Sequence, residues 1–245
     1  MLQGLYSAAA GMAAQQQRLD SLSNDLANVS TTGYKSVRVG FRDLLYTSPG
    51  RQAGPTVGLG AGAAVETLGR SQTQGALQST GNPLDIAIQG DGYLQVRRAD
   101  GTTALTRDGG LQLDSRGRLA PADGDLVQPP IAVPPGTSPR DIAIGPDGTV
   151  RANNRTVGRI GLVTVGAADR LQSVGSSLYA PTAASGAPRA TAATTTLKQG
   201  ALEGSNVDMG DSMVDMIDAQ RSYSLVSKAI QTQDQMLAIA NQVKS

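Results

Sequence analysis

Apolar residues recur every three or four positions at both ends of the 245-residue chain. Spacing of this kind, kept over about four heptads, is typical of an α-helix that carries one apolar seam. We therefore predict a long helix at each end, with seams that match each other. The seam residues are Leu5, Met12, Leu19, Leu22, Leu26 and Val29 in the first helix, and Met216, Tyr223, Val226, Ile230 and Leu237 in the second.

Turn and capping residues mark the inner ends of these helices. Gly33 follows the polar residues 30–32 and suits the left-handed conformation that often ends a helix. Ser205 and Asp208 have the Ser-x-x-Asp spacing of a capping box. We expect the first helix to stop at Gly33 and the second to begin with this capping box.

Between the helices the apolar period changes to two. Residues 84–88, 93–96, 142–144 and 160–165 are the strand candidates. Short strands that are separated by Asp-Gly turns indicate an antiparallel β-domain. The Asp-Gly pairs begin at Asp91, Asp100, Asp108, Asp123 and Asp147.

These patterns predict an α+β protein, with long N- and C-terminal helices paired as a coiled coil and a central, mainly antiparallel β-domain. Residues 47–64 and 181–196 are rich in Gly, Pro and small polar residues, which is typical of extended or flexible segments. Gln-Gly-Ala-Leu occurs at residues 74–77 and again at 199–202, on either side of the β-domain. The predicted division is residues 1–35 for the N-terminal helix, 36–79 for an extended linker, 80–198 for the β-domain and 199–245 for the C-terminal segment and helix.

The terminal helices need partners. An isolated helix is marginal in water, and Gly4 and Gly11 weaken the first one further. Two helices cover only part of each other's surface, so further copies of the chain are the natural remaining partner. The alternative is a helical hairpin within one molecule and no assembly.

Two polar features allow two interpretations each. Asn24 and Asn28 lie one turn apart, and either cap the helix end or hydrogen-bond to the backbone of a neighbouring subunit. Four acidic residues in the second helix form either a solvated face that matches the helix dipole or a contact with Arg18 or Arg38 of another subunit. These acids are Asp208, Asp211, Asp215 and Asp218.

The composition excludes many kinds of chemistry. The chain contains no Cys, His or Trp, and 21 Lys+Arg stand against 20 Asp+Glu. Zinc sites of the usual kind and Ser-His or Cys-His catalytic pairs need the missing residues. The balanced charge argues against nucleic acid and membrane surfaces as partners. We therefore expect no cofactor, no metal site, no nucleic-acid partner and no direct membrane insertion.

The candidate motifs for ligand binding or catalysis fail their context tests. Residues 58–62, Gly-Leu-Gly-Ala-Gly, lack the spacing and the following Lys-Ser or Lys-Thr of a phosphate loop. Asp123 and Asp125 are followed by Leu126, Val127 and Gln128, which are not calcium ligands. We predict that the chain is not an enzyme. A secreted β-rich enzyme acting on glycans is the alternative, because a catalytic carboxylate pair is spatial and leaves no spacing in the sequence.

Targeting signals are weak. The first charged residue is Arg18, and polar residues dilute the segment before it, unlike a cleaved signal peptide. We expect no cleaved signal and no membrane-spanning stretch.

Several blocks of the sequence resemble one family. Those blocks are residues 23–35 (Ser-Asn-Asp-Leu-Ala-Asn-Val-Ser-Thr-Thr-Gly-Tyr-Lys), 82–93, 106–109 (Thr-Arg-Asp-Gly), 204–208 (Gly-Ser-Asn-Val-Asp) and 213–223. In this order they resemble the bacterial flagellar rod and hook proteins, over nearly the whole chain. Residues 43–46, 227–230 and 234–237 favour the distal part of the rod, whereas residues 130–134 resemble its proximal part.

The resemblance implies a structural subunit that polymerises helically with its own copies, with the terminal helices inside the tube. Other rod and hook subunits and the surrounding ring proteins would be its partners. It implies a periplasm-spanning rod that transmits torque, and export by the flagellar type III apparatus. The seam residues, together with Asn24 and Asn28, would then form the assembly interface.

Overall fold

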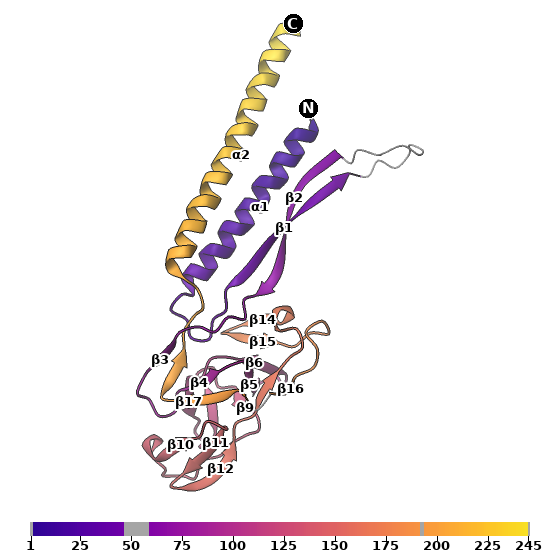
Figure 1. Ribbon diagram of the computed structural model, residues 1–245. Helices are drawn as coiled ribbons and strands as arrows, with labels where there is room; N and C mark the ends of the chain where they lie inside the picture. Colours follow the sequence, from indigo (N-terminus) through magenta and orange to yellow (C-terminus); the bar gives the residue numbers. More distant parts are fainter. Residues whose placement is uncertain (1, 47–58, 192–193, 245) are drawn as a thin grey trace. The chain divides into compact units, whose positions relative to one another are not determined.

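The computed structural model describes residues 2–46, 59–191 and 194–244, which form two long helices, many short strands and two 3-10 turns (Figure 1). The helices are α1 (Leu2–Ala27) and α2 (Met209–Lys244), and the 3-10 turns are η1 (Pro139–Asp141) and η2 (Ala168–Arg170). The strands are β1 (Val37–Tyr46), β2 (Leu59–Arg70), β3 (Leu77–Ser79), β4 (Ile86–Gln89), β5 (Tyr93–Arg97), β6 (Thr103–Thr106), β7 (Leu111–Leu113), β8 (Leu119–Pro121), β9 (Leu126–Val127), β10 (Ile142–Ile144), β11 (Thr149–Ala152), β12 (Arg155–Arg159), β13 (Leu162–Thr164), β14 (Gln172–Gly175), β15 (Leu178–Ala180), β16 (Arg189–Ala190), β17 (Thr196–Gln199) and β18 (Ala201–Glu203). The α+β class predicted from the sequence is confirmed.

The chain divides into two compact units, each built from separate stretches of sequence. The helical unit contains Met1–Ala27, Val37–Leu68 and Asp208–Ser245. The β unit contains Asn28–Ser36 and Gly69–Val207.

In the helical unit, α1 and α2 run antiparallel and pack side by side (Figure 1). Strands β1 and β2 pair with each other and lie beside α1. Helix α1 therefore has two covered sides, one toward α2 and one toward the strand pair.

Small residues on α1 explain the close approach of the strands. A Cβ added to Gly62 of β2 would lie 3.0 Å from Ala10 Cβ and 3.1 Å from Ser7 Cα, and the φ of 97° at this position would strain any other residue. Ala14, one turn further along the same side, is buried. At the end of the helix the buried Asp25 carboxylate accepts a hydrogen bond of 3.2 Å from the Val37 backbone N–H at the start of β1.

The β unit consists of antiparallel pairs. Strands β14, β15, β6, β5, β13 and β16 follow one another in one sheet, with β9 joined to β5, and β10–β11–β12 form a second sheet. Three further pairs are β17 with β4, β18 with β3 and β7 with β8. Aliphatic side chains from these strands, including Ile86, Leu94 and Val127, share one buried core. The β3–β18 pair joins the two Gln-Gly-Ala-Leu segments, so the chain enters and leaves the β unit along neighbouring strands.

Several boundaries differ from the sequence-based expectations. Helix α1 ends at Ala27, six residues before Gly33, because Thr31 turns back to bond to the backbone and side-chain oxygens of Asn28. Gly33 does adopt the predicted left-handed conformation, with φ of 66°. At the start of α2 the cap is Asp208 and not Ser205, since the Asp208 carboxylate accepts a bond of 3.0 Å from the Asp211 N–H.

The segment 36–79, expected to be an extended linker, contains the paired strands β1 and β2 and the strand β3. Its residues 47–58 lie outside the described residues, and so does the side chain of Leu237. In the part of the chain that is described, no helix has the length and apolar character needed to cross a bilayer.

Candidate functional site

The predicted seams occupy the half-buried side of each helix. The side chains of Leu5, Met12, Leu19, Leu22, Leu26, Met216, Tyr223, Val226 and Ile230 are all of intermediate exposure. Ala219, which lies within the α2 seam, is completely buried. Asn28 and Val29 do not belong to the seam, because they follow the end of α1 and lie in the β unit. Asn24 is exposed on α1.

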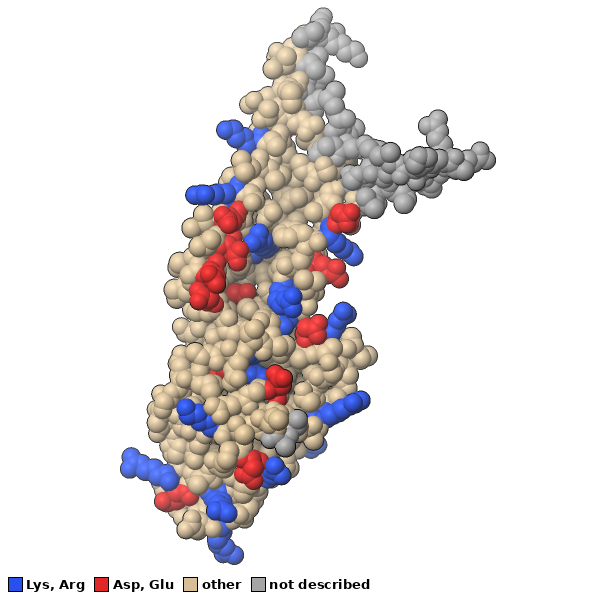
Figure 2. Space-filling model, viewed as in Figure 1, with Lys and Arg blue, Asp and Glu red and all other residues tan. Residues whose placement is uncertain are grey.

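An ion pair joins the two helices beside the seams. Arg18 Nη2 lies 2.9 Å from Asp215 Oδ1, and both side chains are partly exposed. One of the two arginines expected to reach another subunit thus finds its partner within its own chain. Of the remaining acids, Asp208 is exposed at the N-cap of α2, and Asp211 and Asp218 are exposed in its first half, where acidic side chains gather (Figure 2).

Helix α2 has a second apolar stripe that the sequence analysis missed. At roughly 100° per residue, this stripe lies opposite the seam of Met216, Tyr223, Val226 and Ile230. Its members are Val214, Ile217, Leu225, Met236 and Ile239, with exposed fractions of 60%, 48%, 70%, 59% and 60%. An open hollow beside it is lined by residues that include Ile217, Arg221 and Leu225. Arg221, Lys228 and Thr232 interrupt the stripe on the same face. Exposed apolar side chains that gather on one side of a helix are typical of interaction surfaces.

A buried ionic cluster, here called the clasp, lies within the β unit. Its centre is the Glu203 carboxylate on β18, which has no exposure to solvent. Lys35 Nζ donates to it at 2.6 Å, Arg107 Nη1 at 2.9 Å and the Gly75 backbone N–H at 3.0 Å. Lys35 and Arg107 are themselves only 1% and 2% exposed at the side chain.

Two cations thus share one carboxylate, and other groups balance the excess charge. Lys35 Nζ also donates to the Thr73 carbonyl at 2.7 Å, and Arg107 Nη2 donates to the Gly90 carbonyl at 2.8 Å. The Arg107 guanidinium stacks over the Tyr93 ring at 5.4 Å. Burial lowers the pKa of Lys35, although the hydrogen bond and the charge of Glu203 oppose that shift.

Asn206 completes the clasp. Its Oδ1 accepts from the Ser36 N–H at 2.8 Å, and its Nδ2 donates to the carbonyls of Ser71 and Thr73 at 3.3 Å and 3.1 Å. Its own N–H donates to the Tyr34 carbonyl. Three sequence blocks that are far apart along the chain, 33–36, 106–109 and 203–206, therefore meet in one place.

Sequence reasoning interpreted these blocks as helix ends and turns, and missed the clasp. The sequence contains one signal for the clasp. Glu203 is one of only two Glu among the 20 acidic residues, and it directly follows the apolar residues Ala201 and Leu202 in a strand. A carboxylate on the inner side of a strand needs buried partners. Nothing in one sequence indicates that these partners are Lys35 and Arg107.

Tyr93 gives the clasp a measurable pH dependence. Burial raises the pKa of this phenol from 10.0 to about 12, with the Arg107 charge opposing the shift. Above pH 10 the unfolded chain therefore loses a proton that the folded chain keeps, so the free energy of unfolding should fall by about 1.4 kcal/mol per pH unit up to about pH 12. Denaturant unfolding at pH 9 to 12 should show a smaller fall for Tyr93→Phe than for the unmodified chain. Tyr6→Phe, at a phenol that is 66% exposed on α1, is the matched control, and parallel curves for Tyr93→Phe and the unmodified chain would contradict the assignment.

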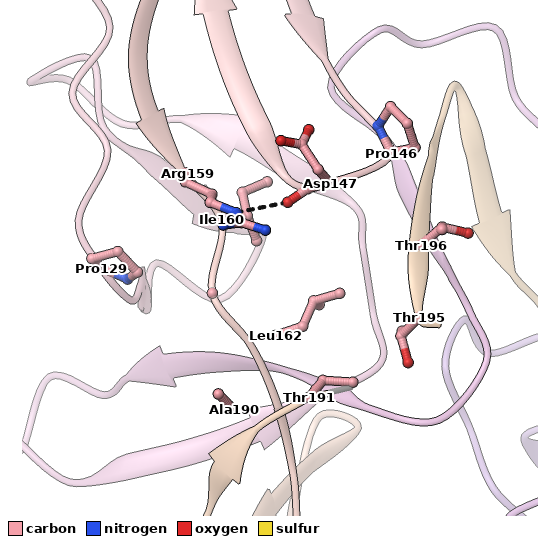
Figure 3. A pocket seen from close by; sticks show the side chains of 11 residues that line it. Pro129, Pro146, Asp147, Arg159, Ile160, Leu162, Ala190, Thr191, Thr195 and Thr196 are labelled. Atoms are coloured by element: carbon pink, nitrogen blue, oxygen red, sulfur yellow. Dashed lines mark hydrogen bonds between the residues drawn. The ribbon is translucent and has the colours of Figure 1, made fainter. Parts of the chain in front are cut away.

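The β unit also contains a hollow of about 660 Å³ (Figure 3). Arg159 Nε donates to the Asp147 backbone carbonyl at 2.8 Å on one side of it, and threonines, prolines, a glycine and aliphatic residues form the rest. Of the residues that line it, only Asp147 carries a carboxyl group, and hydrogen bonds from Thr149 lower the pKa of that group. Glycoside hydrolysis uses two carboxyl groups across a bond, whereas the described residues of this hollow provide one.

Three family models match successive parts of the chain. The model of the flagella basal body rod protein matches residues 5–35. The D1 domain of the flagellar hook protein FlgE/F/G matches residues 87–152, and the C-terminal region of the flagellar basal body rod FlgEFG protein matches residues 198–243.

Curated relatives are similar over their full length. The flagellar basal-body rod protein FlgG of Borreliella burgdorferi is 38% identical over 263 residues, covering 100% of this chain and 99% of the relative. FlgG of Bacillus subtilis is 39% identical over 259 residues, with 97% of each chain covered. The flagellar hook-basal body complex protein FlhP of the same species is 32% identical over 271 residues, with 100% of each chain covered.

Proposed function

This chain belongs to the flagellar basal-body rod protein family, and from that premise we propose that it polymerises helically with its own copies in the distal part of the rod. It is a structural rod subunit and not an enzyme, so the glycan-active alternative is set aside. The distal position fits the FlgG relatives, which are similar from end to end.

The proposal includes the surroundings of the rod. Other rod and hook subunits would contact the chain along the shaft, and ring proteins would surround it in the periplasm. The flagellar type III apparatus would export it without a cleaved signal, and the shaft would transmit torque and enclose the export channel. Helices α1 and α2 would pair as a coiled coil along their seams.

One observation supports polymerisation most strongly, namely the second apolar stripe on α2. The seam of α2 is half-buried in a helix that packs against α1, whereas Ile217, Leu225 and Met236 on the opposite side are about half exposed or more. We propose that a second copy covers this stripe. Each covered aliphatic side chain would contribute about 1.5–3 kcal/mol, which is sufficient to drive association when several act together.

The experiment that tests this proposal is Leu225→Asp in cells that lack the native copy. Leu225 is 70% exposed in the single chain, so the variant should fold normally, yet basal bodies should lack a complete rod and the cells should not swim. Gln231→Asp adds the same charge to an exposed position roughly 120° away around α2 and should leave rods intact. Complete rods in Leu225→Asp cells, counted by electron microscopy, would contradict the proposed interface.

A further inference from the structure

The chain passes between its two units at four points, and the clasp binds the β-unit side of these passages together. The passages follow Ala27, Ser36, Leu68 and Val207. On the β-unit side they continue as the segments 28–36, 69–76 and 203–207.

These segments are hydrogen-bonded to one another. The Gly33 N–H donates to the Glu203 carbonyl at 2.9 Å, and the Ser71 N–H donates to the Ser36 carbonyl at 2.9 Å. Arg70 Nη1 donates to the Lys35 carbonyl at 2.6 Å. With the bonds made by Asn206 and Glu203, every passage segment is tied to the other two.

Arg107 connects this bundle of segments to the strands of the β unit. It follows β6 directly, and it binds Glu203 through one nitrogen and the carbonyl of Gly90, next to β4, through another. The Tyr93 ring of β5 lies against its guanidinium. A force applied to the passage segments therefore reaches three strands of the β unit through one side chain.

The ionic character of the clasp calls for a reason other than stability. A buried ion pair or triad is often no more stabilising than well-packed apolar residues of similar volume, because each charge loses its hydration. Charged hydrogen bonds, however, act only at defined distances and directions, so they fix register where apolar contacts would allow sliding.

We propose that the clasp is a mechanical joint, which holds the four chain passages in fixed register so that they share torsional load. This inference rests on the proposed function as a rod subunit, because the load that it invokes is the torsion of the shaft. Without the clasp each passage would be a separate flexible connection, and load would fall on one of them at a time.

Amide hydrogen exchange on the purified full-length chain tests the structural half of the inference. Glu203→Gln removes the shared negative charge and should speed exchange at least tenfold in residues 28–36, 69–76 and 203–207. Peptides from β8 and β10 in the core should keep their protection. Asp114→Asn, which breaks the partly exposed ion pair with Arg118, is the matched control and should change none of these segments. Unchanged amide exchange in the passage segments, or an equal loss of protection throughout the β unit, would overturn the inference.

Lys35→Met extends the test to cells and avoids leaving a buried charge alone. It retains the Arg107–Glu203 pair, so folding should survive while the passages loosen in residues 33–36 and 69–76. Cells with this variant should build basal bodies in normal number and rotate tethered beads normally at low load. At high load their rotation speed should fall at least twofold.

Two results in cells would overturn the joint. Unchanged high-load rotation would show that the clasp carries no torsion, and absence of rods in Lys35→Met cells would give it a role in assembly instead. Failure of the underlying rod function is a separate result, since the unmodified chain would then fail to restore basal bodies.

Discussion

Replacing Leu26 with Asp is expected to abolish rod assembly while the β unit remains folded. Leu26 lies in the last turn of α1, on the half-buried seam side. The change removes about 1.5–3 kcal/mol of apolar burial and adds a negative charge at a helix C-terminus, which costs about 0.3–1 kcal/mol more. Among the described residues, neither of the two buried apolar clusters includes a residue of the helical unit, so this unit depends on the contacts of α1 with α2 and with β1. We therefore expect both helices to lose amide protection, and basal bodies to lack the rod.

The control for this experiment is Gln17→Asp, at an exposed position of the same helix. It adds the same charge without uncovering the seam, so rods and swimming should be preserved. Protection of β10 should be the same in both variants, because β10 belongs to the other unit. Normal rods in Leu26→Asp cells would show that rod assembly does not depend on the seam.

The sequence predicted the helices and the antiparallel β unit because each has one dominant apolar period. A 3–4 period marked α1 and α2, and a period of two with Asp-Gly turns marked the strands. The repeated Gln-Gly-Ala-Leu segments indicated how the chain enters and leaves the β unit, and they pair as β3 and β18.

The strand pair β1–β2 escaped prediction because its partner surface is a stripe of small residues. Ser7, Ala10 and Ala14 lie on the side of α1 away from the seam, and large apolar residues are missing there. A search for periodic large apolar residues does not detect such a side of a helix. The close packing of Gly62 against α1 nevertheless depends on these small residues. The glycines of β2 were interpreted as flexible because a glycine-rich run looks the same in both cases.

The second apolar stripe of α2 and the clasp were not predicted from the sequence, for different reasons. Val214, Ile217 and Leu225 follow the same helical period as the seam but lie on the opposite side of α2. With apolar residues on two sides, the sequence of α2 does not show a single apolar face. The clasp joins Lys35, Arg107 and Glu203, whose separations along the chain depend on the whole topology. Tertiary contacts of this kind can be identified only when the three-dimensional arrangement of the strands is known.

The Thr-Arg-Asp-Gly block contains a glycine whose replacement should be among the most damaging single changes in the chain. Gly109 follows Arg107 and Asp108, and its carbonyl accepts a hydrogen bond of 3.0 Å from the Ile86 N–H. A Cβ at this position would lie 1.7 Å from the Ile86 carbonyl oxygen and 2.8 Å from its carbon. Ile86 is completely buried in the core, so its backbone cannot move aside without disturbing β4.

Gly109→Ala should therefore lower the free energy of unfolding of the β unit by about 4 kcal/mol, from a lost buried hydrogen bond and a displaced core strand. Gly110→Ala is the matched control, since its Cβ would meet only Asp108 Oδ1, at an ordinary contact distance of 3.4 Å. That neighbouring change should cost at most about 1 kcal/mol. Urea unfolding followed by tyrosine fluorescence measures both variants. Equal midpoints for the two would mean that β4 yields easily to the added methyl group, and that the tight contact between Gly109 and Ile86 does not hold this part of the core.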